Sequence, residues 1–148
     1  ETPVLGVIDQ PILRERWVGA RGHATTFNGT TARVRNCPEL GQSLLATTSP
    51  YLFDTDERPR FEQLAGACGN LVLGGDCYSY AAVAIGQVDL VVEAGLKLYD
   101  YAALVPVIEG AGGRMCDWQG RPLGASSGGQ VVAAGDPALI PAVLEKLA

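Results

Sequence analysis

Residues 74–113 have the sequence GGDCYSYAAVAIGQVDLVVEAGLKLYDYAALVPVIEGAGG, and this stretch decides the fold. Small residues predict a helix at 76–85, the apolar run predicts a strand at 88–94, and a second helical pattern at 100–109 ends at the glycines that follow. Pro106 lies inside that second pattern and should kink the helix or mark an irregular turn. Helices that alternate with apolar strands are typical of an α/β domain.

The same alternation continues on both sides of this stretch. Asp56 is a candidate N-cap for the helix upstream, and Asp136-Pro137 has the cap-then-proline pattern that starts the last helix. From residue 40 onward the order β-α-β-α-β-α-β-β-α predicts a layered α/β sandwich. The further predicted elements are strands at 43–47, 70–73 and 130–134, a helix at 59–68, and a terminal helix whose apolar face is Ile140, Val143, Leu144 and Leu147.

The first part of the chain has a different pattern. Two strand-like runs, 4–8 and 14–18, are separated by a break at Gln10-Pro11, and Asn28-Gly29 is a strong signal for a two-residue hairpin. We therefore expect an antiparallel β meander over residues 1–36 and an α/β unit over residues 37–148.

Composition excludes several classes of function. With 11 basic and 16 acidic residues among 148, the net charge is −5, and no basic face suggests a nucleic-acid or anionic membrane partner. No stretch has the ~20 apolar residues of a membrane span. The four cysteines match no zinc or dithiol spacing, so we expect reduced thiols in a cytoplasmic protein. The chain begins without Met in strand-like sequence, and we expect it to be part of a longer polypeptide.

Three acidic residues lie where predicted strands and helices meet: Asp76, Glu93 and Asp100. Ligands of open α/β sheets gather at such junctions. An ionised oxygen ligand on a rigid helix start is what Mg²⁺ prefers, which makes Asp100 a candidate metal ligand. The alternatives are structural: Asp76 and Asp100 as helix N-caps, and Glu93 as a solvated strand end.

A resemblance favours the functional interpretation. Residues 98–103, LYDYAA, followed by EGAGG at 109–113, resemble the second signature of the inositol monophosphatase superfamily, with Val91-Val92-Glu93 at the expected distance before it. The strand at 3–8 and the hairpin at 27–29 resemble the segments that follow the family's first metal motif. The resemblance covers nearly all of the chain and implies the second half of that α/β fold.

The resemblance also implies roles for the three acidic residues. Asp100 matches a metal ligand of the family, Glu93 matches a residue that contacts the organic part of the substrate, and Asp76 occupies a further substrate-facing position. An acidic residue at position 76 is similar to the histidinol-phosphate phosphatase branch. Histidinol is cationic, whereas inositol carries no positive charge, so an added carboxylate suits the former.

The implied activity is Mg²⁺-dependent hydrolysis of histidinol phosphate in a cytoplasmic enzyme, and the resemblance also suggests a homodimer. The family's first metal motif, Asp-Pro-x-Asp-Gly-Thr, is absent from this chain, so the water-activating residues are expected upstream in the missing N-terminal half. The isolated chain is then expected to be inactive. The alternatives are a phosphatase for inositol or sugar phosphates and a non-catalytic α/β module that associates with its missing half.

Overall fold

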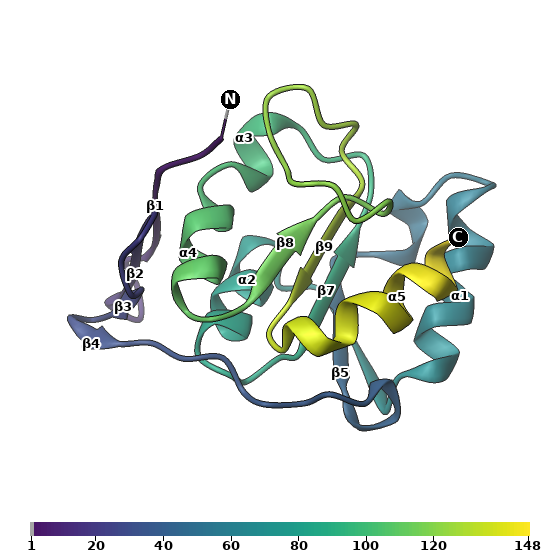
Figure 1. The fold of residues 1–148 in the computed structure, drawn as a ribbon, viewed down its shortest axis with the longest axis horizontal. Coiled ribbons are helices and arrows are strands. Elements are labelled where there is room, and N and C mark those ends of the chain that lie inside the picture. The colour runs from purple at the N-terminus through teal and green to yellow at the C-terminus, as the bar shows by residue number, and fades with distance from the viewer. Residues whose placement is uncertain (1) are drawn as a thin grey trace.

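The computed structural model describes residues 2–148, which form two β-sheets and the helices that pack between and beside them. Figure 1 shows four layers in the order sheet, helices, sheet, helices. The layered α/β architecture with an antiparallel meander at its N-terminal end is confirmed. Among residues 2–148, no helix has the length and hydropathy needed to cross a membrane.

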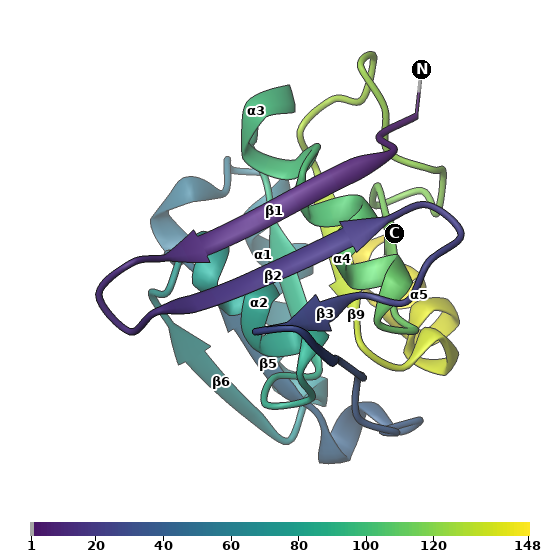
Figure 2. The same cartoon turned by 90° about the vertical axis from the view of Figure 1, so that its left-hand side faces the viewer.

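The first sheet is the antiparallel meander, with strand order β1-β2-β3-β4. Figure 2 shows it in front of the helices α2 and α4. Asn28 and Gly29 both have positive φ, as a tight hairpin between β3 and β4 requires, so the hairpin prediction is confirmed. Its strands are β1 (Leu5–Gln10), β2 (Glu15–Ala20), β3 (Thr26–Phe27) and β4 (Thr30–Thr31).

The second sheet has the order β6-β5-β7-β9-β8. Strands β6, β5 and β7 run parallel, whereas β9 is antiparallel to both β7 and β8. All eight residues of β7 and β9 are buried, because helices cover both faces of the sheet. The strands are β5 (Leu44–Thr47), β6 (Asn70–Leu73), β7 (Leu90–Glu93), β8 (Arg114–Cys116) and β9 (Val131–Ala134).

The helices form two groups. Between the sheets lie α2 (Cys77–Ala84), α3 (Leu98–Tyr101) and α4 (Leu104–Gly110), while α1 (Glu57–Ala67) and α5 (Ile140–Leu147) cover the far face of the second sheet (Figure 1). Short 3₁₀ turns complete the chain at Leu40–Gln42, Pro50–Leu52 and Pro137–Leu139. The predicted order of elements from residue 40 onward is confirmed.

Two details differ from the sequence prediction. The helix expected at 100–109 begins earlier, at Leu98, and is interrupted between α3 and α4, because Pro106 has no N–H to donate to the preceding turn. Asp56 stands at the predicted N-cap position of α1, but its side chain makes no capping hydrogen bond. Instead, Asp54 Oδ1 accepts the N–H groups of Asp56 at 2.9 Å and Glu57 at 2.8 Å.

The meander packs against α4 through glycines. A Cβ atom on Gly6 would lie 1.8 Å from the Ala103 carbonyl oxygen, and one on Gly19 would lie 2.4 Å from that of Pro106. The buried Trp17 and Ile8 fill the remaining space on the same face of the meander and belong to a core that includes residues of α2 and α4. The two sheets therefore share one hydrophobic core, and the proposed boundary between residues 36 and 37 stays a prediction.

Candidate active site

The three acidic residues follow two parallel strands, β6 and β7, that flank β5 in the second sheet. Asp76 comes shortly after β6, whereas Glu93 ends β7 and Asp100 lies in α3, just beyond the same strand. Because β6 and β7 flank β5 in parallel, their carboxyl ends meet at one edge of the second sheet. The order of strands thus gathers the three carboxylates at that edge.

Glu93 is a buried carboxylate with defined partners. Glu93 is only 3% exposed, so the alternative that it is a solvated strand end is wrong. Its Oε1 accepts the backbone N–H of Thr48 at 3.0 Å, and its Oε2 accepts the hydroxyl of Tyr80 at 2.8 Å. These two donors come from the segment after β5 and from α2, and together they satisfy the buried charge and fix the plane of the carboxylate.

The Tyr80 hydroxyl binds one of the three carboxylates, that of Glu93. Burial, followed by the charge and the hydrogen bond of Glu93, holds the pKa of Tyr80 well above its usual value. The charges of Asp76 and Asp100 raise the same pKa further. The phenol consequently stays protonated and acts as a donor to Glu93, and Asp76, Glu93 and Asp100 form the acidic cluster at this end of the sheet.

Asp76 has an unusual backbone conformation. Its φ is 46° and its ψ is −134°, a region that L-amino acids rarely adopt, and it follows two glycines that also have positive φ. Although Asp76 stands at the N-cap position of α2, its side chain makes no capping hydrogen bond. The interpretation of Asp76 as a helix cap is therefore wrong, and its exposed carboxylate is not used to stabilise the helix start.

Asp100 is exposed and does stabilise a helix start, although from the third position of α3 rather than the first. Its Oδ2 accepts the N–H of Lys97 at 2.7 Å, and its own N–H donates to the Lys97 carbonyl at 2.8 Å. This reciprocal pair fixes the side chain on the helix. Its other oxygen, Oδ1, accepts no hydrogen bond from any residue in 2–148 and is available to a cation.

The donor set fits Mg²⁺ only in part. A rigid carboxylate oxygen such as Asp100 Oδ1 is a suitable ligand for a hard cation. However, residues 2–148 contain no group of three or more acidic, His or Cys side chains placed to hold a metal ion. Asp100 would hold the ion together with ligands from outside this chain.

Sequence reasoning missed Thr48 and Tyr80. Thr48 acts through its backbone N–H, for which a residue type gives no signal. Tyr80 lies in a helix of small apolar residues, where an aromatic side chain usually packs in the hydrophobic core. Only its hydroxyl group indicated that the residue needs a hydrogen-bond partner when it is buried.

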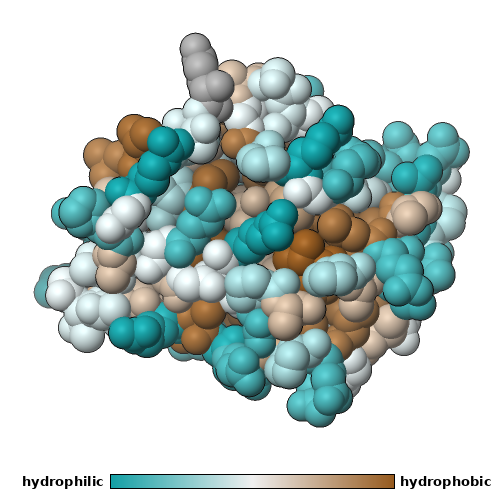
Figure 3. Space-filling model, in the orientation of Figure 1, coloured by the Kyte–Doolittle hydropathy of each residue, from teal (hydrophilic) through white to brown (hydrophobic). Residues whose placement is uncertain are grey.

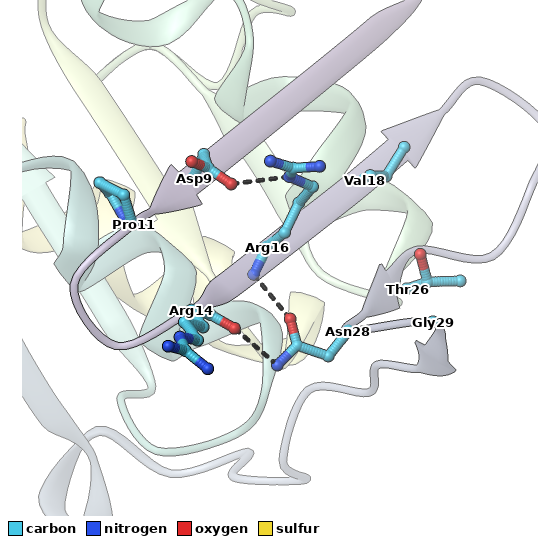
Figure 4. A pocket seen from close by; sticks show the side chains of 8 residues that line it. All are labelled: Asp9, Pro11, Arg14, Arg16, Val18, Thr26, Asn28 and Gly29. Carbon is cyan, nitrogen blue, oxygen red and sulfur yellow. Dashed lines mark hydrogen bonds and ion pairs between the residues drawn. The ribbon is translucent and has the colours of Figure 1, made fainter.

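The widest hollow of the meander lies elsewhere. Figure 4 shows a cavity of about 640 Å³ on its outer face, where the Arg16 Nε donates to Asp9 and the Asn28 side chain bonds to the backbone of Arg14 and Arg16. Asp9 and Arg16 pair with each other there, and none of the three acidic residues singled out from the sequence lines this cavity. The acidic cluster, and not this cavity, is the candidate active site.

Layered α/β proteins bind ligands at the carboxyl ends of their strands, and acidic residues there are suited to bind a metal cation or a cationic group of a ligand. Comparisons with known proteins identify the group. The sequence profile of the Inositol monophosphatase family matches residues 1–148, and the chain belongs to that family.

Individual relatives agree with this assignment. The chain is 48% identical over 152 residues to the "Bifunctional phosphatase IMPL2, chloroplastic" of Arabidopsis thaliana, covering 98% of this chain and 44% of that protein. It is 34% identical over 118 residues to a "Histidinol-phosphatase" of Chlorobaculum parvum, covering 79% of this chain and 46% of the relative. The chain spans less than half the length of these two curated relatives.

A solved structure gives the same result. The structure of an inositol monophosphatase from Zymomonas mobilis has a TM-score of 0.97 to this chain, at 53% identity, and the match covers 99% of this chain and 58% of that one. The chain therefore spans little more than half of that structure.

Proposed function

We propose that this chain is part of a metal-dependent phosphomonoesterase that hydrolyses histidinol phosphate. The observation that carries the proposal is the placement of Asp76, Glu93 and Asp100 after the carboxyl ends of parallel strands, with Glu93 buried against the Tyr80 hydroxyl. Like charges at close range repel one another, so this cluster is stabilised by cations. Within residues 2–148 no Lys or Arg forms an ion pair with any of the three, which leaves the metal and the substrate to supply the positive charge.

Each carboxylate has a distinct part in this proposal. Asp100 would hold Mg²⁺ through its free Oδ1, and bound Mg²⁺ would supply the activation of water and the stabilisation of the leaving oxygen. Asp76 and Glu93 would bind the alcohol portion, with Asp76 facing the ammonium of histidinol. Two relatives with the printed name "Histidinol-phosphatase", at 34% and 33% identity, support this substrate class.

A second candidate is a phosphatase for inositol phosphate or a related sugar phosphate. The observation that favours it is the 53% identity to the inositol monophosphatase from Zymomonas mobilis. The two candidates share the metal and the phosphate chemistry and differ in the group that Asp76 would face, since a polyol offers hydroxyls in place of a cation.

The test uses the complete protein with Mg²⁺ and measures phosphate release from histidinol phosphate and from inositol phosphate. Asp100→Asn keeps the acceptor that closes the start of α3 and removes the charge, so we expect folding to survive and turnover to fall at least ~10-fold. Asp54→Asn is the matched control, because Asp54 is also an exposed carboxylate that accepts backbone N–H groups at a helix start. Wild-type turnover and metal affinity in Asp100→Asn would contradict the metal assignment.

The isolated chain gives a second test. Because Asp100 alone cannot satisfy the octahedral coordination of Mg²⁺, residues 1–148 by themselves should show no Mg²⁺-dependent turnover. Addition of the remaining part of the protein in trans should restore it. Measurable turnover by the purified chain alone would contradict this division of the ligands.

A further inference from the structure

Tyr80 connects the interior of α2 to the acidic cluster. The residue is 1% exposed, and its ring lies in the core that α2 shares with α4 and the meander. Its hydroxyl donates to Glu93 Oε2 at 2.8 Å, across a separation of 13 residues in the chain. A buried phenol needs a partner, and here that partner is the carboxylate that the proposed function places against the substrate.

The geometry leaves little freedom to Glu93. Thr48 N–H holds one oxygen and Tyr80 holds the other, and the two donors come from different elements of the fold. The Thr48 donor is part of the backbone, so only a substitution by proline would remove it. The Tyr80 hydroxyl is therefore the side-chain contact, within residues 2–148, that sets the orientation of this carboxylate.

We propose that Tyr80 is a positioning residue for substrate recognition, which aims Glu93 at the alcohol portion of the phosphate ester. This inference rests on the proposed function, because it requires that Glu93 contacts the substrate. Tyr80 itself is too deeply buried to touch a ligand, so its effect passes through Glu93. A carboxylate held by two donors keeps lone pairs in fixed directions, and binding then costs less side-chain entropy.

The test is Tyr80→Phe in the complete protein with Mg²⁺, because this change removes one oxygen and keeps the ring. Loss of the charge-assisted hydrogen bond should raise KM for histidinol phosphate about tenfold while kcat changes less than about twofold. The matched control is Tyr101→Phe, since Tyr101 is also 1% exposed and its hydroxyl donates to the carbonyl of Gly124 at 2.9 Å. That variant should lose a similar amount of stability and keep the wild-type KM.

A double-mutant cycle distinguishes positioning from a general structural role. In a Glu93→Ala background, Tyr80→Phe should cause no further rise in KM, because the residue through which Tyr80 acts is gone. Additive effects of the two substitutions on KM, or an unchanged KM in Tyr80→Phe, would overturn the inference. The proposed function would still stand in that case, provided that the wild-type protein hydrolyses histidinol phosphate. If the wild-type protein neither binds histidinol nor hydrolyses either ester, the proposed function fails and the inference fails with it.

Discussion

The two sheets of this molecule are covered differently. In the meander, residues alternate between a face that packs on α4 and a face that no other part of residues 2–148 covers, where Leu5 is 62% and Val7 is 48% exposed. Figure 3 shows apolar surface on the side of the molecule where β1 lies. In the second sheet, β7 and β9 are buried on both faces, and the three carboxylates lie at the edge of this fully covered sheet.

This difference in coverage shows which of the two sheets can hold the site residues in fixed positions. A sheet packed on both faces cannot shift without disturbing two layers of close-packed side chains, so it is a rigid base for Glu93 and the loop that carries Asp76. The meander contributes to the site only through its packing against α4 and α2. Substitutions on its inner face should therefore have large effects, and substitutions on its outer face small ones.

The largest effect is expected at Gly6. Because a Cβ there would lie 1.8 Å from the backbone oxygen of Ala103, Gly6→Ala should separate β1 from α4 and lower the free energy of unfolding by about 3 kcal/mol or more. Denaturant unfolding of the purified chain measures this. Gly66→Ala is the matched control: Gly66 lies exposed in α1 with nothing near its Cβ position, so the same substitution should stabilise by about 1 kcal/mol.

Val7→Ala sharpens the comparison within one strand. Val7 is the next residue to Gly6 and points to the outer face, so its truncation should change the free energy of unfolding of the chain by about 0.5 kcal/mol. Equal losses in Gly6→Ala and Val7→Ala would show that the two faces of the meander are covered alike.

An effect smaller than that of Gly6→Ala but larger than that of Val7→Ala is expected where the segment after the meander is attached to the second sheet. The Arg35 guanidinium makes two hydrogen bonds to the carboxylate of Asp89, which is 1% exposed and also accepts the N–H of Leu44 at 2.8 Å. Asp89→Asn keeps an acceptor for Leu44 but loses the ion pair, and should cost about 2 kcal/mol of unfolding free energy.

The control for this ion pair lies on the outer face of the meander. Asp9 and Arg16 form a pair through one hydrogen bond, from the Arg16 Nε, and both side chains are exposed to solvent. Solvent screens such a pair, so Asp9→Asn should leave the unfolding transition within error of the wild type. If both substitutions cost the same, burial of Asp89 contributes nothing to the stability of the attachment.

Much of this fold could be predicted from sequence, because the strongest signals are local. Alternating helices and apolar strands gave the order of elements from residue 40 onward, and Asn28-Gly29 gave the hairpin, since few residues tolerate positive φ at two successive positions. The position of Pro106 predicted an irregularity, although not that the helix divides into α3 and α4.

The site was predicted less completely, because its geometry depends on contacts between distant residues. Asp76 has the residue type and the place of a helix cap, yet its backbone has positive φ, as do the two preceding glycines, and its side chain makes no capping hydrogen bond. Glu93 ends a strand, where carboxylates are usually solvated, but Tyr80 and the backbone of Thr48 bury it. Neither fact follows from local propensity.

Asp76 provides the last of these predictions, and the one that decides the substrate. Glycine adopts the backbone angles of Asp76 without strain, so Asp76→Gly should raise the free energy of unfolding by about 1 kcal/mol while it removes the charge. Asp76→Ala removes the same charge and keeps the strain. Both variants of the complete protein should lose at least ~1 kcal/mol of transition-state binding for histidinol phosphate, and much less for inositol phosphate, because only the former is cationic.

Measurement of kcat/KM for each ester, together with thermal unfolding, separates the effect on stability from the effect on selectivity. Stability should rise only in Asp76→Gly, whereas selectivity for histidinol phosphate should fall in both variants. A ratio of kcat/KM values that stays at the wild-type level in both variants would leave the phosphatase in place and remove histidinol phosphate as its substrate.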